Sequence, residues 1–232
     1  MVRTRSRAAL ARHRPPPAPR FLGSPRPVTE LFIDGPAGRL QLRFEPPPGS
    51  PRAVAVICHP HPLHGGTLDN KVVHQLAKTF VGLGAVAVRF NFRGVGGSEG
   101  EYDEGRGELD DLLTVVEWAA GRWPGLPLWL AGFSFGAYLA LRAAERLAPR
   151  WLVTVAPAIG LFDASPVRLN PATSWLLIQG DADDIVPAPQ VEAWVASMES
   201  KPRLVLLAGA GHFFHGRLNE LRQVVSEDLA SL

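Results

Sequence analysis

Short apolar runs alternate along most of the chain with longer segments in which apolar residues recur every three or four positions. The short runs are typical of buried strands, and the periodic segments are typical of helices with one apolar face. Strands are predicted near residues 28–33, 40–44, 53–58, 85–90, 128–131, 151–155, 175–178 and 204–207. Helices are predicted near residues 70–83, 108–120, 135–147, 188–198 and 217–229. This order predicts an α/β fold with a doubly wound, mostly parallel sheet of eight strands and helices on both faces.

Length and composition favour a single domain. The chain has 232 residues, of which 46% are hydrophobic, and this is enough for a sizeable core.

No stretch reaches the roughly 18 apolar residues of a transmembrane helix, so we expect no membrane partner. Cys58 is the single cysteine, which excludes an internal disulfide and is typical of a reducing compartment. A cytoplasmic protein is therefore predicted, and its oligomeric state is left open.

The first 27 residues differ from the rest in charge. They hold seven arginines and no acidic residue, and removing those charges from the formal net charge of +2 leaves −5 for the remainder. The basic character therefore belongs to this segment, and nucleic-acid binding by the whole protein loses its main support. The segment is rich in proline and poor in large apolar residues. We predict a disordered extension at 1–27, followed by one domain at 28–232.

Ser134 is the candidate nucleophile. It is the central residue of the pattern G-x-S-x-G, directly between a predicted strand and the predicted helix 135–147. A serine on such a sharp turn is typical of a nucleophile elbow, where the hydroxyl projects from the edge of a sheet. Gly132 and Gly136 lack the side chains that would clash in a turn this tight. The alternative is an ordinary strand-to-helix turn with no chemistry.

A serine nucleophile needs a base, and the base needs an acid to orient it. An aspartate cluster at 181–184 follows the strand near 175–178, and His212 follows the strand near 204–207, with His215 as a second candidate base. The carboxyl ends of parallel strands share one edge of a sheet, so these groups can meet the serine there. The sequence thus predicts a Ser-His-Asp site.

Two further blocks complete a resemblance to a known family. HPHPLHGGTLDNKVV at 59–73 and NFRGVGGSEG at 91–100, together with the chain order Ser, Asp, His, resemble the α/β-hydrolase superfamily of serine hydrolases, and small bacterial members without a lid in particular. The likeness extends from about Val28 to the C-terminus. It implies a single-domain α/β-hydrolase fold, and the connection 157–173, with three prolines in 17 residues, is too short for a lid domain.

The resemblance also selects among the candidate residues. The spacing G-x-x-D-x-x-V-P, counted from Gly180, implies that Asp183 is the acid, while Asp181 and Asp184 remain alternatives. The pattern G-x-G-H-x-F implies that His212 is the base and leaves His215 to the pocket or the surface.

The same family uses two backbone N–H groups to stabilise the oxyanion. Phe135 supplies the first. The second comes from residues 59–63, where the prolines have no N–H, and His61 is preferred to Leu63. Leu63, Phe133 and Phe213 are predicted to contact substrate, although core packing is an equal alternative for Phe133 and Phe213.

The predicted function is hydrolysis of a small ester or thioester through an acyl-enzyme, with a small-molecule acyl substrate and with no cofactor or metal. Fold and triad are shared with enzymes that cleave amides or peptides, so such an activity is one alternative, and a non-catalytic relative that binds a ligand is another. A third alternative is a metal site at His59-x-His61-x-x-His64, which lacks the aspartate of the comparable metallohydrolase signature because Leu63 occupies that position.

Overall fold

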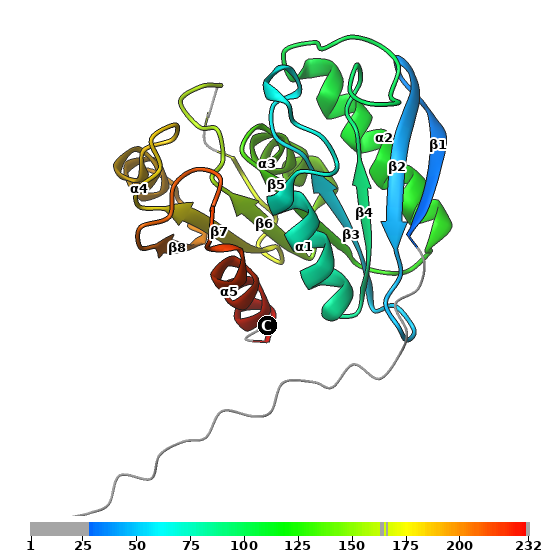
Figure 1. The fold of residues 1–232 in the computed structure, drawn as a ribbon. Coiled ribbons are helices and arrows are strands. Elements are labelled where there is room, and N and C mark those ends of the chain that lie inside the picture. The colour runs from blue at the N-terminus through cyan, green and yellow to red at the C-terminus, as the bar shows by residue number, and fades with distance from the viewer. Residues whose placement is uncertain (1–27, 163–164, 166, 231–232) are drawn as a thin grey trace, which may run out of the picture.

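The computed structural model describes residues 28–162, 165 and 167–230, and the predicted N-terminal extension lies outside this range. The described residues form one eight-stranded sheet in the order β1-β2-β4-β3-β5-β6-β7-β8 (Figure 1). Its strands are β1 (Thr29–Gly35), β2 (Gly38–Glu45), β3 (Ala53–Cys58), β4 (Ala85–Phe90), β5 (Leu128–Phe133), β6 (Trp151–Val155), β7 (Ser174–Gly180) and β8 (Arg203–Leu207). Strand β2 is antiparallel to both neighbours and the other pairings are parallel, which confirms the predicted fold class.

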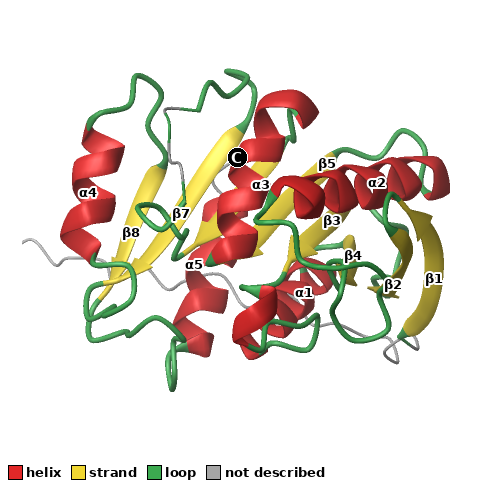
Figure 2. Cartoon of the chain, turned by 90° about the horizontal axis from the view of Figure 1, so that it is seen from above, coloured by secondary structure: helices red, strands yellow, loops and turns green. Residues whose placement is uncertain are grey.

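Helices cover both faces of this sheet (Figure 2). They are α1 (Lys71–Gly82), α2 (Arg106–Arg122), α3 (Phe135–Leu147), α4 (Ala188–Ala196) and α5 (Leu218–Ala230). Helices α1 and α5 lie side by side on the near face in Figure 1, and α2 and α3 lie behind the sheet. Each face has its own apolar core, because the side chains of a strand alternate between the two sides. In β3, for example, Val54 and Val56 pack behind the sheet, whereas Ala55 and Ile57 pack under α1.

Most predicted boundaries are within two residues of the observed ones, and the differences have local causes. Helix α2 begins at Arg106, two residues before the predicted start. The Glu108 carboxylate accepts hydrogen bonds from the N–H groups of Asp103 and Gly105, at 2.9 and 2.8 Å, and caps the helix there. Strand β5 continues to Phe133 because Gly132 and Phe133 still pair with β6. The short 3₁₀ turn η1 (Pro62–His64) was not predicted.

The described residues of the connection from β6 to β7 build no lid. They contain no helix, and an isolated bridge between Ile159 and Phe162 is their only regular pairing. In the described part of the chain, no helix has the length and apolar character needed to cross a membrane.

Candidate active site

Ser134 lies on a strained turn between β5 and α3. Its backbone has φ +54° and ψ −117°, a combination that costs free energy for any residue with a Cβ atom. The surrounding backbone is too close for side chains at the flanking glycines. A Cβ at position 132 would lie 2.2 Å from the Gly136 carbonyl oxygen, and one at position 136 would lie 2.4 Å from the His59 carbonyl oxygen. The Ser134 N–H donates to the Val155 oxygen at 2.9 Å, so strand β6 holds the turn in place.

Three side chains meet at the carboxyl edge of the sheet. The His212 Nε2 atom lies 3.0 Å from the Ser134 hydroxyl oxygen, and the His212 Nδ1 atom lies 2.8 Å from Asp183 Oδ2. All three residues are at least nine-tenths buried. The structure therefore brings together the serine, histidine and aspartate that the sequence analysis predicted.

The surroundings of Asp183 keep it ionised. Burial raises the pKa of its carboxyl group, but hydrogen bonds from His212 and from the N–H groups of Ile185 and Val186 outweigh burial and leave the pKa below its ordinary value. The Gln179 amide also donates to Asp183 Oδ2 at 2.9 Å. A carboxylate accepts hydrogen bonds only, so His212 must carry a proton on Nδ1. The Nε2 lone pair then faces the serine hydroxyl.

The alternative residues occupy other positions. Asp181 accepts a hydrogen bond from the Gly209 N–H at 2.6 Å and braces the loop before His212, while Asp184 is exposed. His215 is also exposed, and its ring stacks on Phe213 with a centroid separation of 5.8 Å. Within the described residues, Asp183 is the one aspartate hydrogen-bonded to His212.

The candidate oxyanion donors differ in whether their N–H groups are free. The Leu63 N–H donates to the His61 Nδ1 atom at 3.2 Å, so it is already used. Over the range that the structure describes, neither the Phe135 N–H nor the His61 N–H has a protein acceptor. The geometry therefore favours His61 over Leu63 as the second donor.

His59 holds the peptide that carries the His61 N–H. Its Nδ1 atom lies 2.6 Å from the Pro60 oxygen, and its Nε2 atom accepts from the Phe92 N–H at 3.1 Å. The C=O and N–H of a trans peptide point in opposite directions, so fixing the Pro60 oxygen also fixes the direction of the His61 N–H. Burial lowers the pKa of His59 to about 4, which keeps the ring neutral and Nε2 able to accept. The sequence analysis did not anticipate this role.

The predicted metal alternative has no geometric support. Both His59 ring nitrogens are occupied by the backbone, and the His61 ring bonds to the Leu63 N–H and to the Tyr102 hydroxyl. No cluster of three potential metal ligands occurs among the described residues. Cys58, the single cysteine, is buried, and burial raises the pKa of its thiol.

A cavity of about 440 Å³ opens above Ser134 and His212. It is also lined by Pro60, His61, His64, Gly65, Asn70, Phe135, Ala158, Leu161, Phe162, Ile185 and Phe213. Of the predicted substrate residues, Phe213 lines this cavity. Leu63 and Phe133 are not among its lining residues; the burial of Phe133 corrects the sequence analysis, and substrate contact by Leu63 stays a prediction. The Leu63 side chain is 68% exposed outside the cavity, and Phe133 is fully buried with its ring 5.1 Å from that of His212.

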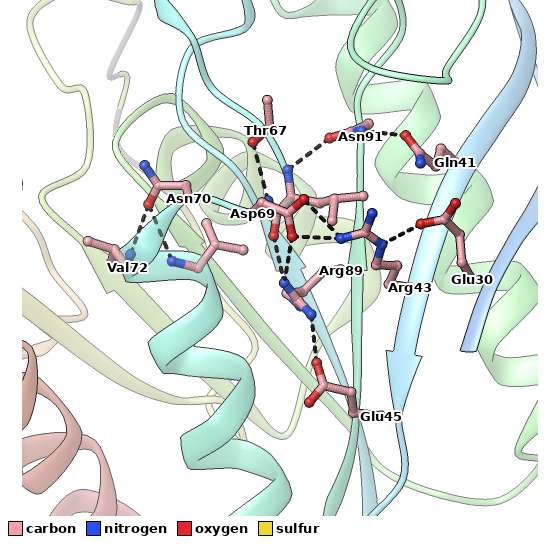
Figure 3. A network of polar contacts seen from close by, with 12 residues as sticks. Glu30, Gln41, Arg43, Glu45, Thr67, Asp69, Asn70, Val72, Arg89 and Asn91 are labelled. Atoms are coloured by element: carbon pink, nitrogen blue, oxygen red, sulfur yellow. Dashed lines mark hydrogen bonds and ion pairs between the residues drawn. The ribbon is translucent and has the colours of Figure 1, made fainter. Parts of the chain in front are cut away.

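Charged side chains anchor the loop between β3 and α1, which forms one wall of this cavity (Figure 3). Asp69 accepts hydrogen bonds from Arg43, and its carboxylate also lies 3.5 Å from the Arg89 guanidinium. The buried Arg89 donates to the Leu68 oxygen at 2.9 Å and to Glu45 at 2.6 Å. The Leu68 N–H donates to the Asn91 side chain at 2.8 Å. These contacts tie the end of the loop to β2 and β4.

Comparison with known proteins identifies the family of this chain. A family model described as "Serine aminopeptidase, S33" matches residues 49–175. The chain is 31% identical over 215 residues to an uncharacterized protein of Rickettsia prowazekii, and the match covers 88% of the chain and 90% of the relative.

Solved structures are similar over nearly their whole length. An alpha-beta serine hydrolase homologue from Coxiella burnetii has a TM-score of 0.82 and 44% identity, covering 87% of this chain and 97% of that one. A serine hydrolase without a lid, from Xanthomonas campestris, has a TM-score of 0.85 and 42% identity, covering 90% and 96%.

Proposed function

We propose that this chain, which belongs to the serine aminopeptidase S33 family of α/β-hydrolases, hydrolyses a small ester or thioester through an acyl-enzyme. Ser134 is the nucleophile, His212 the general base and Asp183 the residue that orients the base. The observation that carries the proposal is the continuous hydrogen-bond path from Ser134 through His212 to Asp183, with distances of 3.0 and 2.8 Å.

The path accounts for the proton movements of both half-reactions. In the first, the Ser134 oxygen attacks the acyl carbon while His212 Nε2 takes the hydroxyl proton, and the N–H groups of Phe135 and His61 donate to the oxyanion. His212 then gives this proton to the departing alkoxide or thiolate. In the second, His212 takes a proton from water, the hydroxide attacks the acyl-enzyme, and the proton returns to Ser134. Asp183 stabilises the imidazolium that forms in each half.

The character of the cavity favours an ester over the free N-terminus of a peptide. Recognition of an α-ammonium group needs a carboxylate or several acceptors at the site. Histidine is the one ionisable residue type among the described residues that line the cavity. The apolar side chains Leu161, Phe162 and Ile185 suit an uncharged acyl group. The alternative activity, cleavage of an aminoacyl amide, follows from the family description and is tested alongside.

A fluorophosphonate probe and a substrate panel test the proposal together. The probe should label the wild-type protein and fail to label Ser134→Ala. The wild type should hydrolyse p-nitrophenyl esters or acyl-CoA thioesters faster than aminoacyl p-nitroanilides. Equal labelling of both proteins would remove Ser134 from its role, and absence of labelling with absence of turnover would favour a non-catalytic binding protein. Faster cleavage of the anilides would favour the aminopeptidase alternative.

A further inference from the structure

We propose that Asn70 donates a hydrogen bond from its side-chain amide to an oxygen atom of the substrate outside the scissile group. Asn70 is thereby a specificity-determining residue that selects esters with an ether, hydroxyl or carbonyl oxygen in the acyl or the alcohol part. This inference rests on the proposed function, because it concerns the same cavity.

The hydrogen bonds of Asn70 fix which way its amide points. Its Oδ1 atom accepts from the N–H groups of Val72 and Val73, at 2.9 and 3.4 Å, and so caps helix α1. Backbone N–H groups can only donate, so the atom that faces them must be the oxygen and the amide nitrogen must point the other way. Figure 3 shows the Asn70 oxygen directed to α1 and the nitrogen directed away from it.

The amide nitrogen is the one polar group of Asn70 that is left without a partner in the range that the structure describes. The backbone N–H donates to the Thr67 oxygen at 3.0 Å, and the backbone oxygen accepts from the His74 N–H at 2.8 Å. Asn70 lines the cavity above Ser134 and is half-buried. Asn70, a residue of the cavity wall, therefore carries two N–H donors without a partner in this range.

Asn70 is also held rigidly. The preceding residue, Asp69, is bound by Arg43 and lies beside Arg89, and Leu68 is bound to Arg89 of β4 and to Asn91, which follows β4 (Figure 3). The following residues form the first turn of α1. A donor fixed in this way loses little conformational entropy when it binds an acceptor, which makes its selection of the substrate more stringent.

The fixed donor favours oxygenated substrates in two ways. An oxygen placed near Asn70 gains a hydrogen bond, and a purely apolar substrate that covers Asn70 removes water from two N–H groups without replacing it. The apolar side chains that also line the cavity, Leu161, Phe162 and Ile185, offer no competing acceptor or donor. The chemical class that fits is an uncharged ester with an apolar part and one oxygen-bearing part.

Matched esters that differ in one atom test the proposal. On the alcohol side the pair is butyl butyrate and 2-methoxyethyl butyrate, and on the acyl side it is butyl pentanoate and butyl 3-methoxypropanoate. Each kcat/KM is divided by the rate constant of alkaline hydrolysis to remove intrinsic reactivity. We expect the wild type to prefer the oxygenated ester of at least one pair by about fivefold, the size of one net hydrogen bond.

The variant Asn70→Asp isolates the donor, because it keeps an oxygen to cap α1 and replaces the amide nitrogen by an acceptor. The preference should fall to about one or reverse, while the melting temperature stays near that of the wild type. The control is Asn170→Asp, where Oδ1 likewise accepts a backbone N–H, from Ala172 at 2.9 Å, but the residue does not line the cavity. It should leave the preference unchanged. No preference in the wild type, or an equal preference in Asn70→Asp, would overturn the proposal.

A binding measurement separates this proposal from the proposed reaction. In ¹⁵N-labelled Ser134→Ala protein, the Asn70 side-chain amide signal, identified by its absence from Asn70→Asp, should shift on titration with the preferred methoxy ester and remain in place with its apolar partner. If this signal shifts but the wild-type protein hydrolyses none of the four esters, the result would refute the proposed reaction and support the role of Asn70. Hydrolysis of all four esters with no selective shift would leave the reaction intact and refute the role of Asn70.

Discussion

Replacing Asp183 by asparagine is the sharpest test of the hydrogen-bond path, because the structure determines how the new amide must orient. One oxygen of the native carboxylate accepts from the N–H groups of Ile185 and Val186, at 2.9 and 2.8 Å. In Asp183→Asn the amide oxygen must stay on that side, since the two backbone donors would repel an NH₂ group. The amide nitrogen then takes the place of Oδ2 and faces His212 Nδ1 and Gln179.

This orientation reverses the tautomer of His212. An NH₂ group opposite Nδ1 requires that nitrogen to accept, so the proton moves to Nε2, and Nε2 can no longer take a proton from Ser134. We expect kcat to fall by about a thousandfold to ten-thousandfold, with a smaller change in KM. The loss should be smaller at high pH, where hydroxide can replace the base.

The assay is a steady-state pH profile of ester hydrolysis, with melting temperature measured in parallel. Asp184→Asn, one position away at an exposed site, is the matched control and should change kcat less than twofold, because solvent and salt screen an exposed charge. Retention of more than about a tenth of wild-type kcat in Asp183→Asn would refute the tautomer argument. A large loss in Asp184→Asn instead would move the acid to the alternative residue.

Three other changes have expected outcomes. Ser134→Gly should abolish turnover but raise the free energy of unfolding by about 1 kcal/mol in denaturant titration, because glycine relieves the strain at φ +54°; a loss of stability would contradict the inferred strain. Gly136→Ala should prevent folding or lower the free energy of unfolding by more than about 3 kcal/mol, because the added Cβ would lie 2.4 Å from the His59 oxygen. The control is Gly121→Ala, where an added Cβ meets nothing within 4 Å, and it should be neutral or stabilising. Burial lowers the pKa of His59 from its ordinary value of 6.5 to about 4 in the folded state. Its contribution to the free energy of unfolding, up to about 3 kcal/mol, is therefore complete above pH 6.5 and is lost as the pH falls toward 4. His59→Asn should flatten the fall in melting temperature over that interval, and an unchanged slope would show that other groups control it.

Strand and helix positions could be predicted because the central strands of this sheet are parallel and buried on both faces. Strand β3 is a continuous apolar run, and β4 and β6 each hold one polar residue, Arg89 and Thr154, among apolar ones; the predicted limits of all three strands are the observed ones. The position of Ser134 followed from the same pattern, since the strand, the glycines and the helix are all local in sequence. The turn η1 escaped prediction because it consists of one backbone hydrogen bond, from the His64 N–H to the His61 oxygen, capped by the His61 side chain, and periodicity does not reveal such contacts.

The site itself was predictable only where residues follow strands. His212 and the aspartate cluster met this condition, but the choice among the aspartates depended on the resemblance. The geometry shows why they differ: Asp181 turns to the Gly209 N–H while Asp183 turns to His212. Phe133 was a wrong prediction for the cavity because strand side chains alternate, and its position in β5 directs it into the core under α1 and α5. His59 and Asn70 were missed because their roles depend on which backbone groups lie opposite them.

The position of β8 at the edge of the sheet has a consequence for how the site can fail. Among the described strands it has one neighbour, β7, and most of its side chains are only partly buried or exposed. The loop that carries His212 follows this strand directly, whereas Ser134 follows the central strand β5. Elements with few buried contacts open at lower free energy than the core of a domain. Detachment of β8 would therefore separate the base from the nucleophile while the remaining strands stay paired. Activity would then depend on the local opening of one edge of the sheet, and it could be lost under conditions in which most of the molecule is still folded.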